Sequence, residues 1–196
     1  MKKRFTHYRL ITVAAFAAAF AGVLAACGGS SSDNIALTGA ITGLTVDGLV
    51  LSLNGTSNTT FAANANAVVL PRVVPGSSYS VTVVAQPPGL TCRVSNGTGV
   101  AGTNDIGNVN VACVPNYSLG GSITGLTVSG LVLTNGSDTV SPQANSTSFV
   151  FPTKVGNGFS YGVTIFAQPA GQNCTIQNGT GVMGSTDVTS VVVTCA

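Results

Sequence analysis

The sequence predicts an all-β protein of two tandem seven-stranded β-sandwiches that follow an N-terminal signal helix. Two observations lead to this prediction. Apolar and polar residues alternate along many short segments, which is the pattern of half-buried strands. Much of the sequence also occurs twice, at a constant offset of 82 residues.

The first 26 residues have the three parts of a secretory signal. Basic residues lie at the start, residues 10–23 are almost wholly apolar, and small residues precede Cys27. The apolar stretch 10–26 has 17 residues, and no stop-transfer charges follow it. Because a membrane-spanning helix needs about 20 apolar residues, the sequence favours a signal peptide over a transmembrane helix.

The motif Leu24-Ala25-Ala26-Cys27 resembles the lipobox of bacterial lipoproteins. In that family the thiol is diacylated, the leader is cut before it, and the new amine is usually acylated. The resemblance implies that Cys27 begins the mature protein and carries palmitate-like chains, which anchor it to a membrane without spanning it. An ordinary cleavable signal that ends near Ala26 is the alternative. The family commonly retains proteins with Asp after the cysteine in the inner membrane, so Gly28 implies the outer membrane.

Removal of the leader leaves 170 residues with three basic side chains and five Asp, a net charge of −2. A nucleic-acid site requires clustered Lys and Arg, so no nucleic-acid partner is predicted. The mature chain also has no His, Glu or Trp. A Ser nucleophile therefore has only Lys154 or an Asp as a base, no Ser-x-x-Lys motif is present, and the Asp residues are widely separated. The sequence predicts no catalytic residue and no enzyme.

The internal repeat defines the domain organisation. Residues 41–46 return as 123–128, and residues 96–100 return as 178–182. Further counterparts are Tyr79 and Tyr161, Gln86 and Gln168, Pro87 and Pro169, Gly89 and Gly171, Cys92 and Cys174, and Cys113 and Cys195. We therefore predict the lipidated cysteine and a flexible Gly/Ser tether over 27–35, one sandwich over 36–114 and another over 117–196. Pro115-Asn116 is expected to be a very short joint.

The alternation within each repeat predicts strands and their buried faces. Tyr79, Val81, Val83 and Ala85 are expected on a core face, and the same pattern recurs in residues 161–167. Leu49, Leu51 and Leu53 alternate likewise, as do Val109, Val111 and Cys113. Turn sequences such as Asn54-Gly55 and Pro75-Gly76 separate these runs. About seven short strands in roughly 80 residues favour a sandwich in each repeat.

The order of motifs resembles prealbumin-like modules of the carboxypeptidase-regulatory and Cna-B kind. The motifs are Gly-x-Ile-x-Gly, an apolar strand, Phe-Val-Phe-Pro, and Gly-x-x-Tyr-x-Val-x-Ile. The chain is also similar to tandem repeats in other secreted bacterial lipoproteins, in which Gln-Pro-x-Gly-x-x-Cys-x-x-x-Asn-Gly-x-Gly precedes a closing Val-x-Cys. These resemblances imply a sandwich scaffold, which is Ig-like in outline, and no particular chemistry.

Four cysteines remain besides Cys27, two in each repeat at identical spacing. In an exported protein they predict the disulfides Cys92–Cys113 and Cys174–Cys195, each tying the sixth strand to the seventh. Each bridge closes 22 residues, and the chain-entropy model gives roughly 3.4 kcal/mol of stabilisation for such a loop. A zinc site of four thiolates is the alternative, but the spacing lacks a Cys-x-x-Cys pair.

Two further motifs each have a structural explanation and a functional one. Gly97-x-Gly99-x-x-Gly102, repeated at 179–184, matches a dinucleotide-binding fingerprint, but it leads into a strand and not a helix. A glycine-rich hairpin turn is therefore expected. Asp105 and its counterpart Asp187 offer oxygen ligands for calcium, although one carboxylate per loop is too few. No metal or cofactor is predicted.

The sequence favours a lipid-anchored, non-enzymatic binding, adhesion or structural module of the bacterial envelope, with an unknown protein or glycan partner. A passive spacer and a carbohydrate-binding module are the alternatives. An exposed aromatic cluster would favour binding, and a uniform Ser/Thr/Asn surface would favour a spacer. Phe166, the counterpart of Val84, is out of phase with the core face. We expect it outside the core, at an edge or an inter-domain contact.

Overall fold

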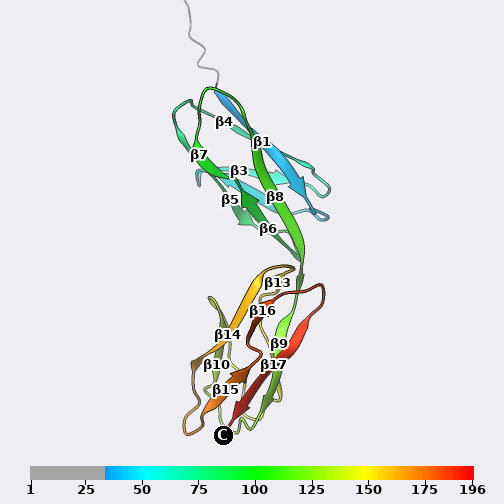
Figure 1. The fold of residues 1–196 in the computed structure, drawn as a ribbon, viewed down its shortest axis with the longest axis vertical. Helices are drawn as coiled ribbons and strands as arrows, with labels where there is room; N and C mark the ends of the chain where they lie inside the picture. Colours follow the sequence, from blue (N-terminus) through cyan, green and yellow to red (C-terminus); the bar gives the residue numbers. More distant parts are fainter. Residues whose placement is uncertain (1–33) are drawn as a thin grey trace, which may run out of the picture. The chain divides into compact units, whose positions relative to one another are not determined.

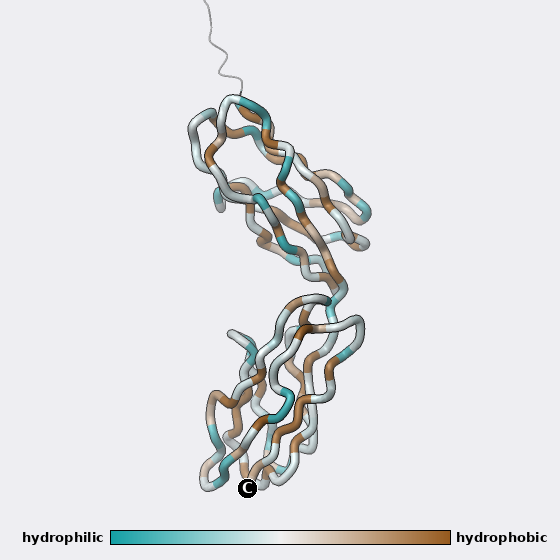
Figure 2. Tube along the Cα trace, viewed as in Figure 1, coloured by the Kyte–Doolittle hydropathy of each residue, from teal (hydrophilic) through white to brown (hydrophobic). Residues whose placement is uncertain are grey.

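The computed structural model describes residues 34–196, which form only strands and turns (Figure 1). The predicted signal peptide 1–26, Cys27 and nearly all of the tether lie outside the described residues. Within 34–196 the all-β prediction holds, since the strands run from β1 to β17 with no helix between them. Figure 2 shows the alternation of hydrophobic and hydrophilic residues along these strands.

The first repeat forms two sheets that share one core. One has its own strands in the order β4-β1-β8-β6 and a fifth strand, β13 (Val155–Gly156), that also pairs with β8. The other has four strands in the order β3-β2-β5-β7. The strands are β1 (Ile35–Thr42), β2 (Leu49–Leu53), β3 (Ser57–Phe61), β4 (Ala67–Val73), β5 (Ser78–Ala85), β6 (Leu90–Ser95), β7 (Thr98–Val100) and β8 (Ile106–Tyr117). The first strand pairs in parallel with the last, whereas the other neighbours are antiparallel.

The second repeat has the same arrangement, with the orders β12-β9-β17-β15 and β11-β10-β14-β16. Its strands are β9 (Leu119–Thr124), β10 (Val132–Asn135), β11 (Asp138–Val140), β12 (Ser148–Val150), β14 (Ser160–Ala167), β15 (Cys174–Gln177), β16 (Thr180–Val182) and β17 (Val188–Cys195). Here too the first strand of the repeat, β9, lies parallel to the last, β17.

Each repeat thus contributes eight strands to its own two sheets, one more than the predicted seven, and β13 of the second repeat joins the sheet of the first. The difference lies in short segments that carry little periodicity. β7 and β16 have only three residues each, which is too short for alternation to identify a strand. Both are nevertheless held in place, because β7 pairs with β5 and β16 pairs with β14.

Two separate hydrophobic cores lie between the sheets. The first includes Leu37, Leu51 and Val109, and the second includes Leu119 and Leu133, all of them fully buried. The predicted core faces agree with this arrangement for Leu49, Leu51 and Leu53, for Tyr79 and Val81, and for Val109, Val111 and Cys113. At the end of β5 the agreement stops, since Ala85 is exposed. Burial of these side chains is the main stabilising contribution to each repeat.

Strand β8 continues through the predicted joint at residues 115–116. Pro115 pairs with Leu90 of β6, and Tyr117 pairs with Val155 of β13 (Val155–Gly156). The guanidinium carbon of Arg93 also lies 4.3 Å from the ring centroid of Phe159, which is a cation–π contact. The segment expected to be a short connecting joint is therefore a strand that pairs on both sides of Pro115.

Candidate functional site

The structure contains both predicted disulfides, Cys92–Cys113 and Cys174–Cys195. In each, the two cysteines are direct cross-strand neighbours, with a Cα–Cα distance of 3.9 Å. The bridges join the sixth strand of a repeat to its last strand within one sheet, β6 to β8 and β15 to β17. The four sulfurs lie in separate pairs within the two cores, so the zinc alternative does not fit.

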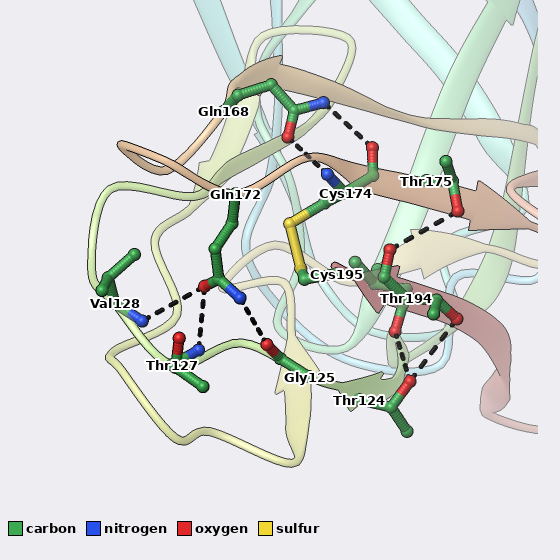
Figure 3. Close-up of a disulfide and its surroundings, with 11 residues drawn as sticks. Thr124, Gly125, Thr127, Val128, Gln168, Gln172, Cys174, Thr175, Thr194 and Cys195 are labelled. Atoms are coloured by element: carbon green, nitrogen blue, oxygen red, sulfur yellow. Dashed lines mark hydrogen bonds between the residues drawn. A yellow bond between two sulfur atoms is a disulfide. The ribbon is translucent and has the colours of Figure 1, made fainter.

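A glutamine stands beside each disulfide. Gln168 Nε2 donates to the Cys174 carbonyl oxygen at 2.9 Å, and the Cys174 N–H donates to Gln168 Oε1 at 2.8 Å (Figure 3). Gln86 and Cys92 make the same pair of bonds in the first repeat. The repeated spacing from Gln to Cys therefore has a structural explanation, since the glutamine satisfies the free backbone groups of an edge strand.

The turn after the first strand of each repeat lies against the second cysteine of the bridge. Gly43 and Gly125 have φ angles of 73° and 76°, which favour glycine. A Cβ at either position would also overlap the carbonyl oxygen of Cys113 or Cys195. In the second repeat, Gln172 Nε2 donates to the Gly125 carbonyl oxygen at 2.7 Å (Figure 3). The glycine of the repeated Ile-Thr-Gly-Leu sequence is thus required by the backbone around the disulfide.

Each of the four Asp side chains among the described residues accepts a hydrogen bond from a backbone N–H. Asp105 accepts from Ala36 and Asp187 from Ser118, both at 2.7 Å, so each ties the closing loop of its repeat to the start of the first strand. Asp47 and Asp138 accept from the N–H groups of Ala63 and Thr153. Among residues 34–196, no three His, Cys, Asp or Glu side chains cluster in a way that could hold a metal ion.

The glycine-rich segments connect the two sheets of a sandwich. β6 lies in one sheet and β7 in the other, so the segment between them is a crossover and not the expected hairpin turn. Asn96 has a φ of 55°, and Gly99 lies against the ring of Tyr79, where a Cβ would be 2.8 Å from the phenol oxygen. Because β7 is a strand, the helix N-terminus that a dinucleotide site requires is missing at this segment.

Phe166 is 76% exposed, as its phase predicted. It lies in a β-bulge, because Ala167 pairs with Val132 and Ile165 pairs with Leu133, which leaves Phe166 without a partner in β10. Val84 occupies the equivalent bulge of the first repeat and is 53% exposed. So high an exposure does not fit the expectation of an inter-domain contact. The other large hydrophobic side chains exposed within residues 34–196 are valines.

Sequence reasoning missed a shallow pocket of about 380 Å³ in the second repeat. It lies over strands β9, β12 and β17, and its lining includes Gly120, Ser122 and Ser148. The first repeat has Thr38 at the position of Gly120, but a Cβ on Gly120 would overlap the Phe149 carbonyl oxygen, so this glycine allows the close approach of β12 and does not by itself indicate the pocket. No helix long and apolar enough to cross a membrane occurs in residues 34–196.

No family model and no curated protein matches this sequence. Among solved structures, the chain is similar to the Bacillus anthracis TIE protein, with 12% identity and a TM-score of 0.32. That match covers 83% of this chain and 34% of the TIE chain, so this chain spans about a third of its length.

Two further similar structures come from Lactobacillus rhamnosus GG. The C-terminal fragment of the pilus adhesin SpaC has 11% identity and a TM-score of 0.30, over 82% of this chain and 95% of the fragment. The shaft pilin SpaA has 10% identity and a TM-score of 0.28, over 83% of this chain and 97% of the pilin. At these TM-scores the likenesses assign neither a family nor a function.

Proposed function

We propose that this chain is a lipid-anchored, non-enzymatic binding or structural module of the bacterial envelope. In this proposal the leader 1–26 is removed, Cys27 is acylated, and the tether holds two β-sandwiches close to the outer membrane. The protein contacts the membrane only through the lipid on Cys27. Its other binding partner is a protein or a glycan.

The observation that carries the proposal is the pair of disulfides, Cys92–Cys113 and Cys174–Cys195. Structural disulfides persist in exported proteins and are rare in the reducing cytosol. They therefore support export, which the apolar leader also indicates. Leu24-Ala25-Ala26-Cys27 adds the anchor, because two or three acyl chains hold a protein far more firmly than one.

The state of the acidic side chains supports a non-enzymatic role. A general acid or base must reach a substrate proton, and a nucleophile needs an adjacent base. Asp47, Asp105, Asp138 and Asp187 are each engaged by a backbone N–H, which is a structural use of the carboxylate. The sequence after residue 26 has no His and no Glu to replace them.

A passive spacer is the second candidate, and one observation favours it. Phe166 is the single large aromatic side chain among the exposed hydrophobics of residues 34–196. An adhesive surface is typically enriched in clustered aromatic residues. A spacer would use the two sandwiches only for length and stability, whereas a binding module needs a site on their surface.

The anchor is tested by metabolic labelling with a fatty-acid analogue. Wild-type protein should incorporate the label, and Cys27→Ala should lose it and keep its leader, because the acylated cysteine is what the lipoprotein peptidase recognises in proteins of this kind. Gly29→Ala serves as the control, since it leaves the cysteine in place. Equal labelling of wild type and Cys27→Ala would show that Cys27 is not the acceptor.

Density fractionation tests which of the two membranes holds the protein. The proposal places the wild-type protein in the outer-membrane fraction, and Gly28→Asp should shift it toward the inner membrane. An identical distribution of the two proteins would remove the proposed sorting role of Gly28. Protease shaving of whole cells then separates surface display from a periplasmic position, because only a displayed protein is cut before lysis.

A further inference from the structure

The two repeats contact each other directly at the joint around Pro115. Strand β13 belongs to the second repeat by sequence, but it pairs with the end of β8 of the first repeat. Beyond β13, the Asn157 N–H donates to the Pro115 carbonyl oxygen at 2.9 Å. A single residue, Ser118, separates β8 from β9. Residues 155–159, which we call the docking segment, therefore lie against the end of the first repeat.

The first repeat contributes the ends of β6 and β8 to this contact. Gly156 is buried, and a Cβ on it would lie 3.0 Å from Thr91 Cβ and 3.1 Å from Val114 Cγ2. At the other end of the docking segment, the Arg93 guanidinium carbon lies 4.3 Å from the Phe159 ring centroid. The docking segment thus holds the first repeat by strand pairing, by close packing and by a cation–π contact.

The first repeat has the same turn as the docking segment, but with different side chains. In both repeats a backbone N–H donates across the turn, from Ser77 to Val74 in the first and from Phe159 to Gly156 in the second. Each turn also contains a glycine of nearly equal φ, 80° and 79°. The backbone is therefore shared. Three positions differ, which are Val74 and Gly156, Pro75 and Asn157, and Ser77 and Phe159.

These differences are the ones that the contact requires. The Val74 side chain is 57% exposed, whereas a valine at position 156 has no room beside Thr91 and Val114. A proline at position 157 has no N–H to donate to Pro115. The opposite side of the contact differs between the repeats as well. Its pairs are Thr91 and Asn173, Arg93 and Thr175, and Val114 and Ala196. Both sides of the contact have thus diverged between the repeats, while the cysteines of the two disulfides are unchanged.

Tandem domains with a small interface usually move relative to each other. Here the joint itself is hydrogen-bonded to both repeats. The Asn116 N–H donates to the Gly89 carbonyl oxygen of the first repeat, and the neighbouring Pro115 carbonyl oxygen accepts from Asn157 of the second. A rotation about the backbone of these two residues would break bonds on one side or the other, and a buried or partly buried hydrogen bond is costly to leave unmade.

We propose that the docking segment locks the two sandwiches into one rigid body. The second repeat is then held at a fixed distance and direction from the first, as a stiff spacer or a presenting arm requires. The inference goes beyond the proposed function, and it does not depend on acylation of Cys27, because every contact that carries it lies within residues 89–159.

Distances between two spin labels, measured by double electron–electron resonance, test the proposal on the full chain in detergent. Thr82→Cys and Thr164→Cys place one label on each repeat, at equivalent exposed positions of β5 and β14. Protein without the two new cysteines is the labelling blank. One narrow distribution of label-to-label distances is the expected result for the native joint.

The unlocking variant gives the docking segment the residues of the first repeat, Gly156→Val with Asn157→Pro. It should broaden the distance distribution at least about twofold, because the bond to Pro115 and the packing on Thr91 are lost. The second sandwich should still fold, since the first sandwich has the same two residues in the same turn, and hydrogen exchange of β14 and β17 checks this. Equal widths for the native joint and the folded unlocking variant, whether both narrow or both broad, would overturn the proposal.

The matched control is the reciprocal change in the first repeat, Val74→Gly with Pro75→Asn. It should leave the distribution as narrow as that of the native joint, because no other repeat precedes this turn within residues 34–196. If the unlocking variant loses exchange protection in the second repeat, Thr91→Asn with Arg93→Thr takes its place, since it alters the contact from the side of the first repeat. It should broaden the distribution likewise, and a width equal to that of the native joint would overturn the proposal. A failure of fatty-acid labelling at Cys27 would affect only the proposed anchor.

Discussion

The side-chain amide of Gln86 makes the two hydrogen bonds to the Cys92 backbone that a neighbouring strand would otherwise make. Its Nε2 donates to the Cys92 carbonyl oxygen at 3.0 Å, and its Oε1 accepts from the Cys92 N–H at 2.7 Å. In an antiparallel pair of the non-hydrogen-bonded kind, the backbone groups of a residue point away from its partner. Cys92 lies opposite Cys113 in this way, at the free edge of β6, so its backbone groups need an outside partner. Gln86 supplies both bonds.

Replacement of Gln86 by Ala should therefore destabilise the first repeat by about 1–3 kcal/mol, because a donor and an acceptor of the β6 edge lose their partners. Gln168→Ala should have the same effect on the second repeat, where the bonds to Cys174 are equivalent. Denaturant unfolding of the intact protein measures both. Gln177→Ala, an exposed change on β15, is the control and should stay within about 0.5 kcal/mol of wild type. Equal stability of Gln86→Ala and Gln177→Ala would contradict this role.

The disulfides should act as independent staples of the two sandwiches. Replacement of Cys92 and Cys113 by Ala should lower the stability of the first repeat by roughly 2–5 kcal/mol and leave the second nearly unchanged. The cores are separate, so the reciprocal pair, Cys174 and Cys195, should show the reverse. Two unfolding transitions, followed by hydrogen exchange in each repeat, give the answer. Equal loss of protection in both repeats would instead mean that they unfold as one unit.

Gly39 and Gly121 are required by close packing and not by their backbone angles. A Cβ on Gly39 would overlap the Val109 carbonyl oxygen, and one on Gly121 would overlap that of Val191. Both glycines lie beside an irregularity between parallel first and last strands. Gly39→Ala should therefore cost about 1–3 kcal/mol or more, because the backbone of β8 has to move.

The matched control for Gly39 is Gly102→Ala, since nothing lies within 4 Å of a Cβ at that position. Gly184→Ala is the same control for Gly121→Ala in the second repeat. Thermal unfolding compares the two variants of each repeat. If Gly39→Ala is as stable as Gly102→Ala, the parallel pairing of β1 with β8 is not as close as the structure has it.

Phe166 should contribute little to the stability of the isolated chain, because its side chain is 76% exposed in the bulge of β14. Phe166→Ser is expected to change the free energy of unfolding by no more than about 0.5 kcal/mol. Val163→Ala, on the buried face of the same strand, should cost at least about 1 kcal/mol. Denaturant unfolding compares the two, and a large loss for Phe166→Ser would mean that the ring packs against another part of the protein.

Local patterns in the sequence were sufficient for the fold class and for much of the core. Leu49, Leu51 and Leu53 recur at every second position and all three are buried on β2, although Ser52 between them is buried as well. The two disulfide pairs followed from the equal distribution of four cysteines over two repeats. Strand periodicity is a property of short, contiguous segments, and the repeat is found by comparing the sequence with itself, so neither inference needs the strand pairing.

The site was less accessible to sequence reasoning. A glycine in a strand has several explanations, and only the structure shows that Gly120 lies against the Phe149 carbonyl oxygen of β12. Ser122 and Ser148, which both line the shallow pocket, are 26 positions apart in the sequence and become neighbours only through the pairing of β9 with β12. Register of this kind cannot be read from alternation alone.

The sequence by itself determined that residues 34–196 are made of strands, which residues of the long strands face a core, and that the pattern occurs twice. Only the tertiary structure decided that β1 lies parallel to β8, that Gln86 closes the edge beside Cys92, and that strand β8 continues through Pro115. The physical reason is the distance in sequence over which each feature is determined. Alternation records whether a side chain is buried, whereas the choice of strand partner depends on packing between residues such as Leu37 and Ile106, which are far apart in the chain.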